Sequence, residues 1–368
     1  MEYDKPFKTF NELVHYLETE HGLKIINGDA ERKYISSILH MIPYYDLVNG
    51  YKGCFMENDQ FCSDVVFPDL LLFYSFDRGF QNAIFPFSIM VEDYFKNILA
   101  YVIARDFGVH QNTYLDERHY VTSSGTLIYK KLHQRIRSIY ESRKCDENGQ
   151  FLIPAEYQFK DLKYIDEPTR HYVDHHDHIP PWILLKNVTF SSATNLFRLM
   201  KKKQKSEIAQ LMIHADIPVD QKIQILIYAL TLIRTCRNYI AHNLKFISFS
   251  AKKYSGGISR KALSEWIPRE LVSSKELKHG RNISDIYAYI FFSLALIPDS
   301  FHKFLLLSRL SDYLQFMLDT NSRLPLWQKT YIKYIEATNL PLDLHNRLIT
   351  YRKVLLSRVI SQFPISSS

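Results

Sequence analysis

Cysteine and glycine are both scarce in this sequence, and each shortage argues against a class of structure. The four cysteines form no CxxC pair and no other zinc-ligand spacing, which argues against a zinc centre. Only 11 glycines occur among 368 residues, and none builds a glycine-rich phosphate-binding loop. Few glycines combined with many Leu, Ile, Tyr and Phe residues favour long helices over a turn-rich β-sandwich.

Long apolar runs are also missing. The longest, from Ile286 to Ile297, is too short to span a bilayer. Residues 1–20 carry charges throughout, which is not the pattern of a secretory signal. We therefore expect a soluble cytoplasmic protein with reduced cysteines and no contact with a membrane.

The bulk composition is typical of a globular protein with a substantial core. Apolar residues make up 46% of the chain and charged residues 23%. Lysine and arginine outnumber aspartate and glutamate by 46 to 39, which gives a net charge of +7. This mildly basic balance fits a protein that meets a polyanion on one face, although a plain solvated surface explains the charge slightly better.

Helical periodicity predicts an all-α protein. The strongest block covers residues 68–106, with Pro68 in its first turn, Pro86 as a kink or break, and Gly108 after its last turn. Another long helix is predicted over about residues 219–243. Further helices are expected over residues 5–17, 30–41, 126–144, 192–203, 204–215, 283–297, 299–320 and 325–362.

Proline and glycine punctuation divides the chain into three regions. Residues 1–67 are predicted to form an N-terminal helical extension. Residues 68–250 would form a helical core with an inserted loop region at about 145–181. Residues 251–368 would form a C-terminal helical region, which is rich in loops up to about residue 280.

The most informative segment is the end of the helix predicted over residues 219–243. Arg234, Asn238 and His242 are spaced four apart there, so they stack on one helical face. Arg237 precedes His242 by five residues, which places the two about 140° apart around the helix axis. For both to touch one phosphate, either the Arg237 side chain curls round the helix, or a second copy of the chain completes the site across a two-fold axis.

Arginine, asparagine and histidine suffice for metal-free cleavage of RNA. The ribose 2′-hydroxyl attacks the neighbouring phosphorus while His242 takes or gives a proton, because histidine titrates near neutral pH. Arg237 donates hydrogen bonds to the phosphate oxygens, and Asn238 orients the histidine or the substrate. The products would carry a 2′,3′-cyclic phosphate and a 5′-hydroxyl. The alternative is structural, because the helix dipole favours Arg and His near a helix C-terminus.

The segment Arg237-Asn-Tyr-Ile-Ala-His242 resembles the R-N-x-x-A-H form of the HEPN signature R-x4-6-H. The order of segments over about residues 5–250 is similar to that of the Abi (abortive infection) family, in particular its AbiD and AbiF group. The similar segments are Lys5-Pro-Phe, Ile42-Pro-Tyr-Tyr, Gly50-Tyr51, Leu72-Phe-Tyr-Ser-Phe-Asp77-Arg78, the polar pair Glu92 and Lys96, and Ile179-Pro-Pro-Trp182. There are two departures. The family commonly follows its histidine with another His and a basic residue, giving A-H-H-x-R, whereas Asn243-Leu-Lys245-Phe follows His242 here. The segment Phe80-Gln-Asn82 also lacks a familiar Arg.

The resemblance implies a HEPN-type helical bundle with additional N- and C-terminal helices. It implies a metal-independent endoribonuclease that acts as a toxin in phage defence, with RNA as substrate, no cofactor and, in some members, a small antitoxin RNA. One motif per chain again favours a homodimer. Four residues are expected to support the motif helix: Arg234, Asp77, Arg78 and Glu92. The alternatives are a non-catalytic RNA-binding or regulatory HEPN protein, and a toxin whose partner is a protein such as a modifying nucleotidyltransferase.

Two further clusters invite a functional interpretation. The lysines Lys201, Lys202, Lys203 and Lys245 are candidates for binding the RNA backbone, although a solvated helix face explains the first three as well. The other cluster comprises His171, Asp174, His175, His176, Asp177 and His178. Neighbouring prolines argue against the helix that a metal site would need there, so we expect no metal.

Overall fold

The computed structural model describes residues 5–121, 172, 175–251, 257–318 and 325–362, and these are mostly helical. The longer helices are α1 (Phe10–Thr19), α2 (Gly28–Met41), α4 (Phe67–Phe107), α9 (Phe190–Leu199), α10 (Lys202–Met212), α11 (Val219–Ala241), α14 (Ile286–Leu296), α15 (Ser300–Leu318), α16 (Pro325–Thr338) and α17 (Leu344–Gln362). The shorter ones are η1 (Tyr45–Asn49), α3 (Lys52–Phe55), α5 (Gln111–Tyr114), η2 (Glu117–His119), α8 (Pro181–Asn187), η5 (Phe246–Ser248), α12 (Arg260–Trp266) and α13 (Ser274–Lys278). The strands described are β1 (Met56–Glu57) and β2 (Gln60–Phe61), which form one antiparallel pair. The prediction of an all-α protein is confirmed.

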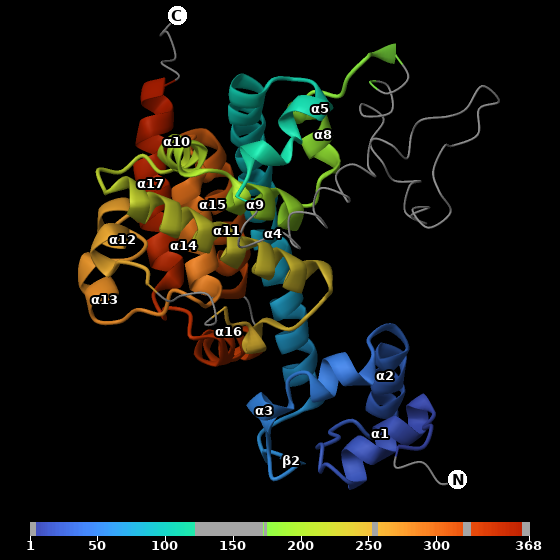
Figure 1. Ribbon diagram of the computed structural model, residues 1–368. Helices are drawn as coiled ribbons and strands as arrows, with labels where there is room; N and C mark the ends of the chain where they lie inside the picture. The colour runs from blue at the N-terminus through green and yellow to red at the C-terminus, as the bar shows by residue number, and fades with distance from the viewer. Residues whose placement is uncertain (1–4, 122–171, 173–174, 252–256, 319–324, 363–368) are drawn as a thin grey trace, which may run out of the picture.

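Helix α4 is the central helix, against which most of the longer helices pack (Figure 1). The N-terminal helices lie at its first end, and α5 and α8 lie toward its last. Pro68 occupies the first turn, where its missing N–H has no helical partner in any case. The helix continues through Pro86, so that proline neither ends nor splits it. It stops at Gly108, whose φ of 90° lies outside the range that other residues adopt easily.

One hydrophobic core surrounds α4 and reaches from the N-terminal helices to α17. Helices α8, α9, α10, α11, α14, α15 and α16 all pack against α4. Helix α14 is buried on every side because it is apolar around its whole circumference. Its Tyr289 hydroxyl donates a hydrogen bond of 2.7 Å to the Ile84 carbonyl of α4. Helices from the predicted C-terminal region therefore complete the same core as α4.

One prediction about the C-terminal region is wrong. Residues 325–362 form two helices, because Asn339 adopts a left-handed φ of 54° and Pro341 follows shortly after. Residues 257–280, which were expected to be rich in loops, contain the short helices α12 and α13 between loops. The helix predicted over residues 126–144 lies outside the described residues.

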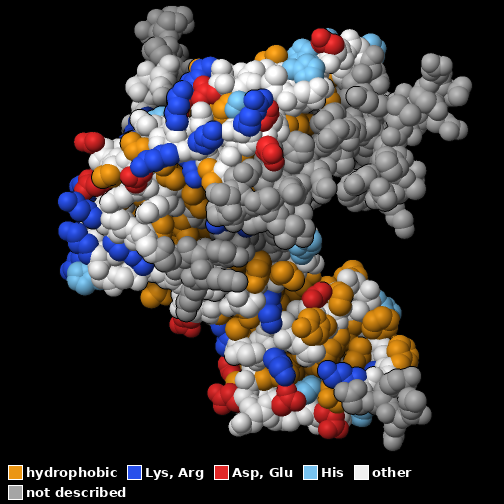
Figure 2. All heavy atoms as spheres, viewed as in Figure 1, with side chains coloured by type: hydrophobic (Ala, Val, Ile, Leu, Met, Phe, Trp, Pro, Cys, Tyr) orange, Lys and Arg blue, Asp and Glu red, His pale blue; other side chains and the backbone are white. Residues whose placement is uncertain are grey.

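The N-terminal helices expose apolar side chains on one face, which Figure 2 shows as orange atoms over α1 and α2. The exposed apolar residues of this region are Phe7, Phe10, Ile26, Tyr34, Met41 and Tyr45. Within the described parts of the chain, no helix is both long enough and apolar enough to cross a bilayer.

Candidate functional site

The C-terminal end of α11 carries the predicted motif, and a well-formed cap fixes its geometry. His242 is the C-cap residue, and Asn243 follows in the left-handed region with φ 58°. The Leu244 N–H donates to the Tyr239 carbonyl at 2.9 Å, and the Asn243 N–H donates to the Ile240 carbonyl at 3.0 Å. These two bonds form a Schellman motif, in which asparagine is one of the few residues that tolerate the left-handed position. The departure from the family pattern after His242 thus supplies the residue that ends the helix.

The predicted motif residues occupy the last three turns of α11 and differ in exposure. Asn238 and His242 are exposed, whereas Arg237 is half-buried. The Arg237 Nε is buried and has no hydrogen-bond partner among the described residues. Arg234 donates to the Ser191 hydroxyl of α9 at 3.2 Å, so it fastens α11 to its neighbour. The motif therefore offers an exposed imidazole and amide next to an arginine that retains unused donor capacity.

Asp77 of α4 holds the segment that follows His242. Its carboxylate is fully buried and accepts four hydrogen bonds. Oδ2 accepts from the Tyr51 hydroxyl at 2.6 Å, the Gln81 amide at 3.0 Å and the Phe246 N–H at 3.2 Å. Oδ1 accepts from the Tyr334 hydroxyl of α16 at 2.7 Å. One carboxylate thus joins the N-terminal region, α4, the end of the motif and the C-terminal helices.

Burial and hydrogen bonding act on Asp77 in opposite directions. Burial raises the pKa of the Asp77 carboxyl, while the bonds from Tyr51, Tyr334 and the Phe246 N–H act to lower it. Burial, followed by the nearby Asp77 charge, raises the pKa of both the Tyr51 and the Tyr334 hydroxyl. The two tyrosines therefore stay protonated and remain donors to the carboxylate.

A second set of bonds reaches the backbone between the motif and Phe246. The Gln81 amide donates to the Leu244 carbonyl at 3.0 Å, and the Arg78 guanidinium approaches the same oxygen at 3.4 Å. The Arg78 guanidinium also lies over the Tyr74 ring, 5.1 Å from its centroid. Gln81 stands in the segment where the family commonly has an arginine, and here its amide bridges Asp77 to the motif end.

The sequence reasoning missed four contributors to this arrangement, namely Tyr51, Gln81, Tyr334 and Asn243. Gln81 lies one helical turn after Asp77, a spacing that could have indicated the contact. Asn243 carried a signal as well, because asparagine after a long helix is a typical stop residue. The sequence offered no signal for Tyr334, because 257 residues separate it from Asp77.

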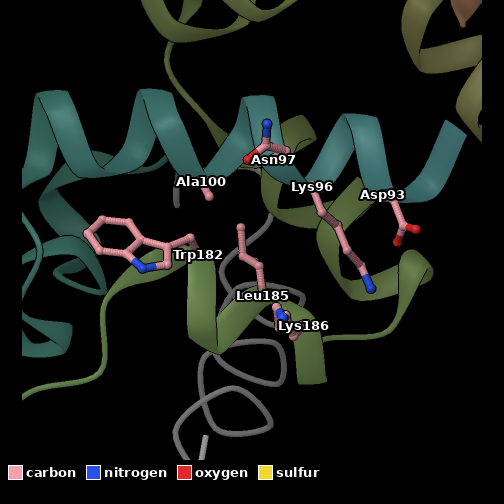
Figure 3. Close-up of a pocket in the computed structure, with 7 residues that line it drawn as sticks. All are labelled: Asp93, Lys96, Asn97, Ala100, Trp182, Leu185 and Lys186. Atoms are coloured by element: carbon pink, nitrogen blue, oxygen red, sulfur yellow. The ribbon is translucent and has the colours of Figure 1, made fainter. Parts of the chain in front are cut away.

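Glu92, which was expected to support the motif helix, lies about three turns of α4 beyond Gln81, the residue that contacts the motif end. Its carboxylate pairs with Lys96 at 2.7 Å, one turn further along α4. Glu92 lies 11 residues beyond Gln81, which corresponds to about 16 Å along the helix. Lys96 instead lines a separate hollow between α4 and α8 (Figure 3).

The four candidate RNA-binding lysines are not gathered in one place. Lys201, Lys202 and Lys203 are exposed at the start of α10, and Lys202 pairs with Asp220 of α11 at 3.0 Å. Asp220 and His242 stand near opposite ends of α11, about 33 Å apart by helical rise. Lys245 is half-buried and lies three residues after His242, so it is the one lysine of the set that adjoins the motif.

The expected histidine and aspartate cluster can be followed only in part, because His171 and Asp174 lie outside the described residues. Of its other members, His178 contacts the Asp177 carboxylate at 2.7 Å. Within the described ranges, no three His, Cys, Asp or Glu side chains are grouped so that they could hold a metal ion.

The fold and the motif end together define an all-α protein whose central helix supports an exposed asparagine and histidine beside a half-buried arginine. A family model described as Abi-like protein matches residues 37–248, which is more than half of the chain. The chain belongs to the Abi-like protein family. The matched span includes Tyr51, Asp77 and His242, and it ends before the helix that carries Tyr334. No curated protein and no solved structure matches the chain.

Proposed function

We propose that this Abi-like protein is a metal-independent endoribonuclease of the HEPN kind that acts in abortive infection, a defence against phage. The exposed end of α11 carries this proposal, because it presents Asn238 and His242 beside an arginine with unused donors. The histidine protrudes from a capped helix end that Asp77 and Gln81 hold in place. Such a rigid support is what a catalytic side chain needs.

The chemistry requires no group beyond the motif and the RNA. His242 takes the proton of the ribose 2′-hydroxyl as that oxygen attacks the adjacent phosphorus. The bond from phosphorus to the 5′-oxygen breaks, and that oxygen gains a proton as it leaves. Arg237 donates to the phosphate oxygens and offsets the charge that builds up on them. The products are a 2′,3′-cyclic phosphate and a 5′-hydroxyl.

A two-fold dimer would bring two copies of the motif to one phosphate. Within one copy, Arg237 and His242 project about 140° apart around α11, because the helix is regular up to Ala241. A second copy can supply the arginine, and its histidine can protonate the leaving oxygen. The proposal therefore includes a homodimer. Dimers that combine one Arg237→Ala chain with one His242→Ala chain should regain part of the activity.

Cleavage of labelled single-stranded RNA in excess EDTA tests the proposal. Wild-type protein should produce cyclic phosphate ends, and His242→Ala and Arg237→Ala should lose roughly a hundredfold or more in rate. Two matched controls are His214→Ala and Arg309→Ala, which remove exposed side chains of the same kind elsewhere. DNA of the same sequence should remain intact because it lacks the attacking hydroxyl.

The other outcomes are equally informative. Equal cleavage by wild type and both motif variants would place the activity elsewhere or in a contaminant. RNA binding with no cleavage by any of them would favour the non-catalytic RNA-binding alternative. Toxicity of the wild type on expression, lost in His242→Ala, would support a role as a toxin.

A further inference from the structure

A hollow of about 400 Å³ lies between α4 and α8, apart from the motif end. Figure 3 shows the two helices side by side across it. Asp93, Lys96 and Asn97 face it from α4, while Trp182 and Lys186 face it from α8. These residues recur at helical spacing on each helix, so each helix turns one continuous face toward the hollow. Its volume falls in the range of roughly 300–1,000 Å³ that is common for small-ligand sites.

The two ends of the hollow differ in chemistry. At one end the Trp182 indole is 46% exposed, although tryptophan is a residue that proteins usually bury to a large extent. At the other end lie the ammonium of Lys96 and the carboxylate of Asp93 (Figure 3). Lys186 is exposed and forms no ion pair with the described residues. An aromatic face at one end, with the Lys186 side chain between it and the charged end, suits a ligand that has a flat ring and a phosphate (Figure 3).

The charges of the hollow indicate how much negative charge such a ligand carries. Lys96 is already paired with Glu92 at 2.7 Å. Asp93 offsets Lys186 in formal charge, so the described residues that line the hollow, taken together with Glu92, carry no net charge. A single phosphodiester adds one negative charge, which Lys186 can meet on its own. A nucleoside triphosphate adds several, and most of them would lack a partner. The balance therefore favours a nucleotide inside a strand over a free triphosphate.

We propose that this hollow binds one nucleotide of a single-stranded RNA, with its base stacked on Trp182 and its phosphodiester beside Lys186. Asn97 carries both a donor and an acceptor for the edge of the base. The proposal rests on the proposed function, because the same strand would continue to the motif end of α11. Asp93 lies 12 residues beyond Gln81, about 18 Å along α4, so a few nucleotides would separate the hollow from the cleaved phosphate.

The path between the hollow and the motif runs along packed elements. Helix α8 ends at Asn187, and α9 begins at Phe190. The next residue, Ser191, accepts the hydrogen bond from Arg234 of the motif helix. The wall that carries Trp182 is thus joined to the motif helix through one short connection. A strand held in the hollow would have a defined position relative to His242.

Equilibrium binding of the full chain to a short fluorescent 2′-O-methyl oligonucleotide tests the proposal. This modified strand cannot be cleaved, so binding is measured independently of the ribonuclease reaction. Trp182→Ala should weaken binding by about 5- to 150-fold, the usual cost of losing one stacked base. Trp182→Phe should keep most of the affinity, because it retains an aromatic face. Circular dichroism would show that both variants are folded.

The lysine of α8 that faces the hollow gives an independent readout. Lys186→Ala should weaken binding and reduce the slope of its salt dependence by about 0.7, the contribution of one phosphate contact on a single strand. The matched control is Lys278→Ala, which removes an exposed lysine of α13 and should leave both the affinity and the slope unchanged. A slope that changes equally in the two variants would contradict a specific phosphate contact at Lys186.

The outcomes separate this proposal from the ribonuclease proposal. Equal affinity of wild type, Trp182→Ala and Lys186→Ala would overturn the nucleotide site, whatever the cleavage assay shows. Binding that depends on Trp182, together with no cleavage of ordinary RNA, would keep the site and overturn the ribonuclease. No binding by any form would overturn the site as well. Stronger competition by adenosine triphosphate than by an unlabelled strand would overturn the preference for a phosphodiester.

Discussion

Removing the Asp77 carboxylate should destabilise the protein far more than neutralising it. Three donors point at Oδ2, whereas Oδ1 meets only the Tyr334 hydroxyl. In Asp77→Asn the side-chain carbonyl can stay at the Oδ2 position and accept the same three bonds. The amide then faces Tyr334, whose hydroxyl accepts as readily as it donates. All four contacts survive, and the buried charge disappears.

Asp77→Ala instead leaves four buried donors without this acceptor. An orphaned buried donor costs about 1–3 kcal/mol. Gln81 keeps its bond to the Leu244 carbonyl, and water that enters the hole offsets part of the loss. We expect Asp77→Ala to lower the free energy of unfolding by about 3–5 kcal/mol. For Asp77→Asn we expect about 1 kcal/mol or less.

Urea unfolding followed by circular dichroism measures both values, and RNA cleavage can be followed on the same samples. Asp216→Ala is the matched control, since it removes an exposed carboxylate with no ion pair among the described residues. Cleavage should fall with Asp77→Ala even under conditions where the variant is folded, because the exit of α11 loses a support. Equal unfolding midpoints for Asp77→Ala and Asp77→Asn would refute the reasoning, because hydrogen bonding at this position would then contribute nothing.

The same carboxyl predicts the direction of a pH effect. Burial raises the pKa of Asp77 above its unfolded value of about 3.9, so the folded state binds this proton more readily than the unfolded state. The contribution of this group to stability is complete below the unfolded pKa and is lost as pH rises through the folded pKa. Wild type should therefore lose stability relative to Asp77→Asn as pH rises from about 4. The opposite trend would contradict a raised pKa.

Two backbone positions give further predictions. At Asn243, whose φ is 58°, a β-branched side chain should cost about 1–2 kcal/mol, so Asn243→Val should lower both the melting temperature and the cleavage rate. Asn243→Gly should keep both, and an equal loss in the two variants would show that the asparagine side chain itself is needed. At Gly79 an added methyl group would collide with the phenol ring of Tyr313, so Gly79→Ala should cost about 1–3 kcal/mol in urea unfolding. Gly53→Ala, at a position surrounded by open space, is the control, and a similar cost there would point to a general helix effect.

Long local patterns predicted the main helices well. The sequence indicates a helix over residues 68–106, and α4 covers Phe67–Phe107. The motif helix was expected over about residues 219–243, and α11 covers Val219–Ala241. Both succeed because apolar periodicity over many turns is a local property that the packed core then reinforces. The prediction of a single helix over residues 325–362 is wrong. The apolar pattern continues on both sides of Asn339, and it gives no sign of the left-handed backbone that ends the helix there.

The hydrogen-bond partners within the candidate site could not be predicted in the same way. The resemblance pointed to Asp77 and Arg78, but not to which groups the carboxylate would meet. Tyr51 and Tyr334 reach it from 26 residues before and 257 residues after, which only tertiary packing decides. The lysine run from Lys201 to Lys203 illustrates the reverse case. Its charge is plain in the sequence, yet the fold puts it near the far end of α11 from His242.

The bond between Tyr334 and Asp77 has a consequence for anyone who would shorten this protein. The family match covers residues 37–248, and a gene fragment cut to those limits would contain the whole motif. It would also lack α14, α15 and α16, so the apolar side chains of α4 that these helices cover would be exposed. The Asp77 carboxylate would lose the hydrogen bond from the Tyr334 hydroxyl. Such a fragment would be expected to aggregate, and its inactivity would say nothing about the motif. The smallest unit fit for biochemical work is therefore larger than the part that sequence comparison recognises.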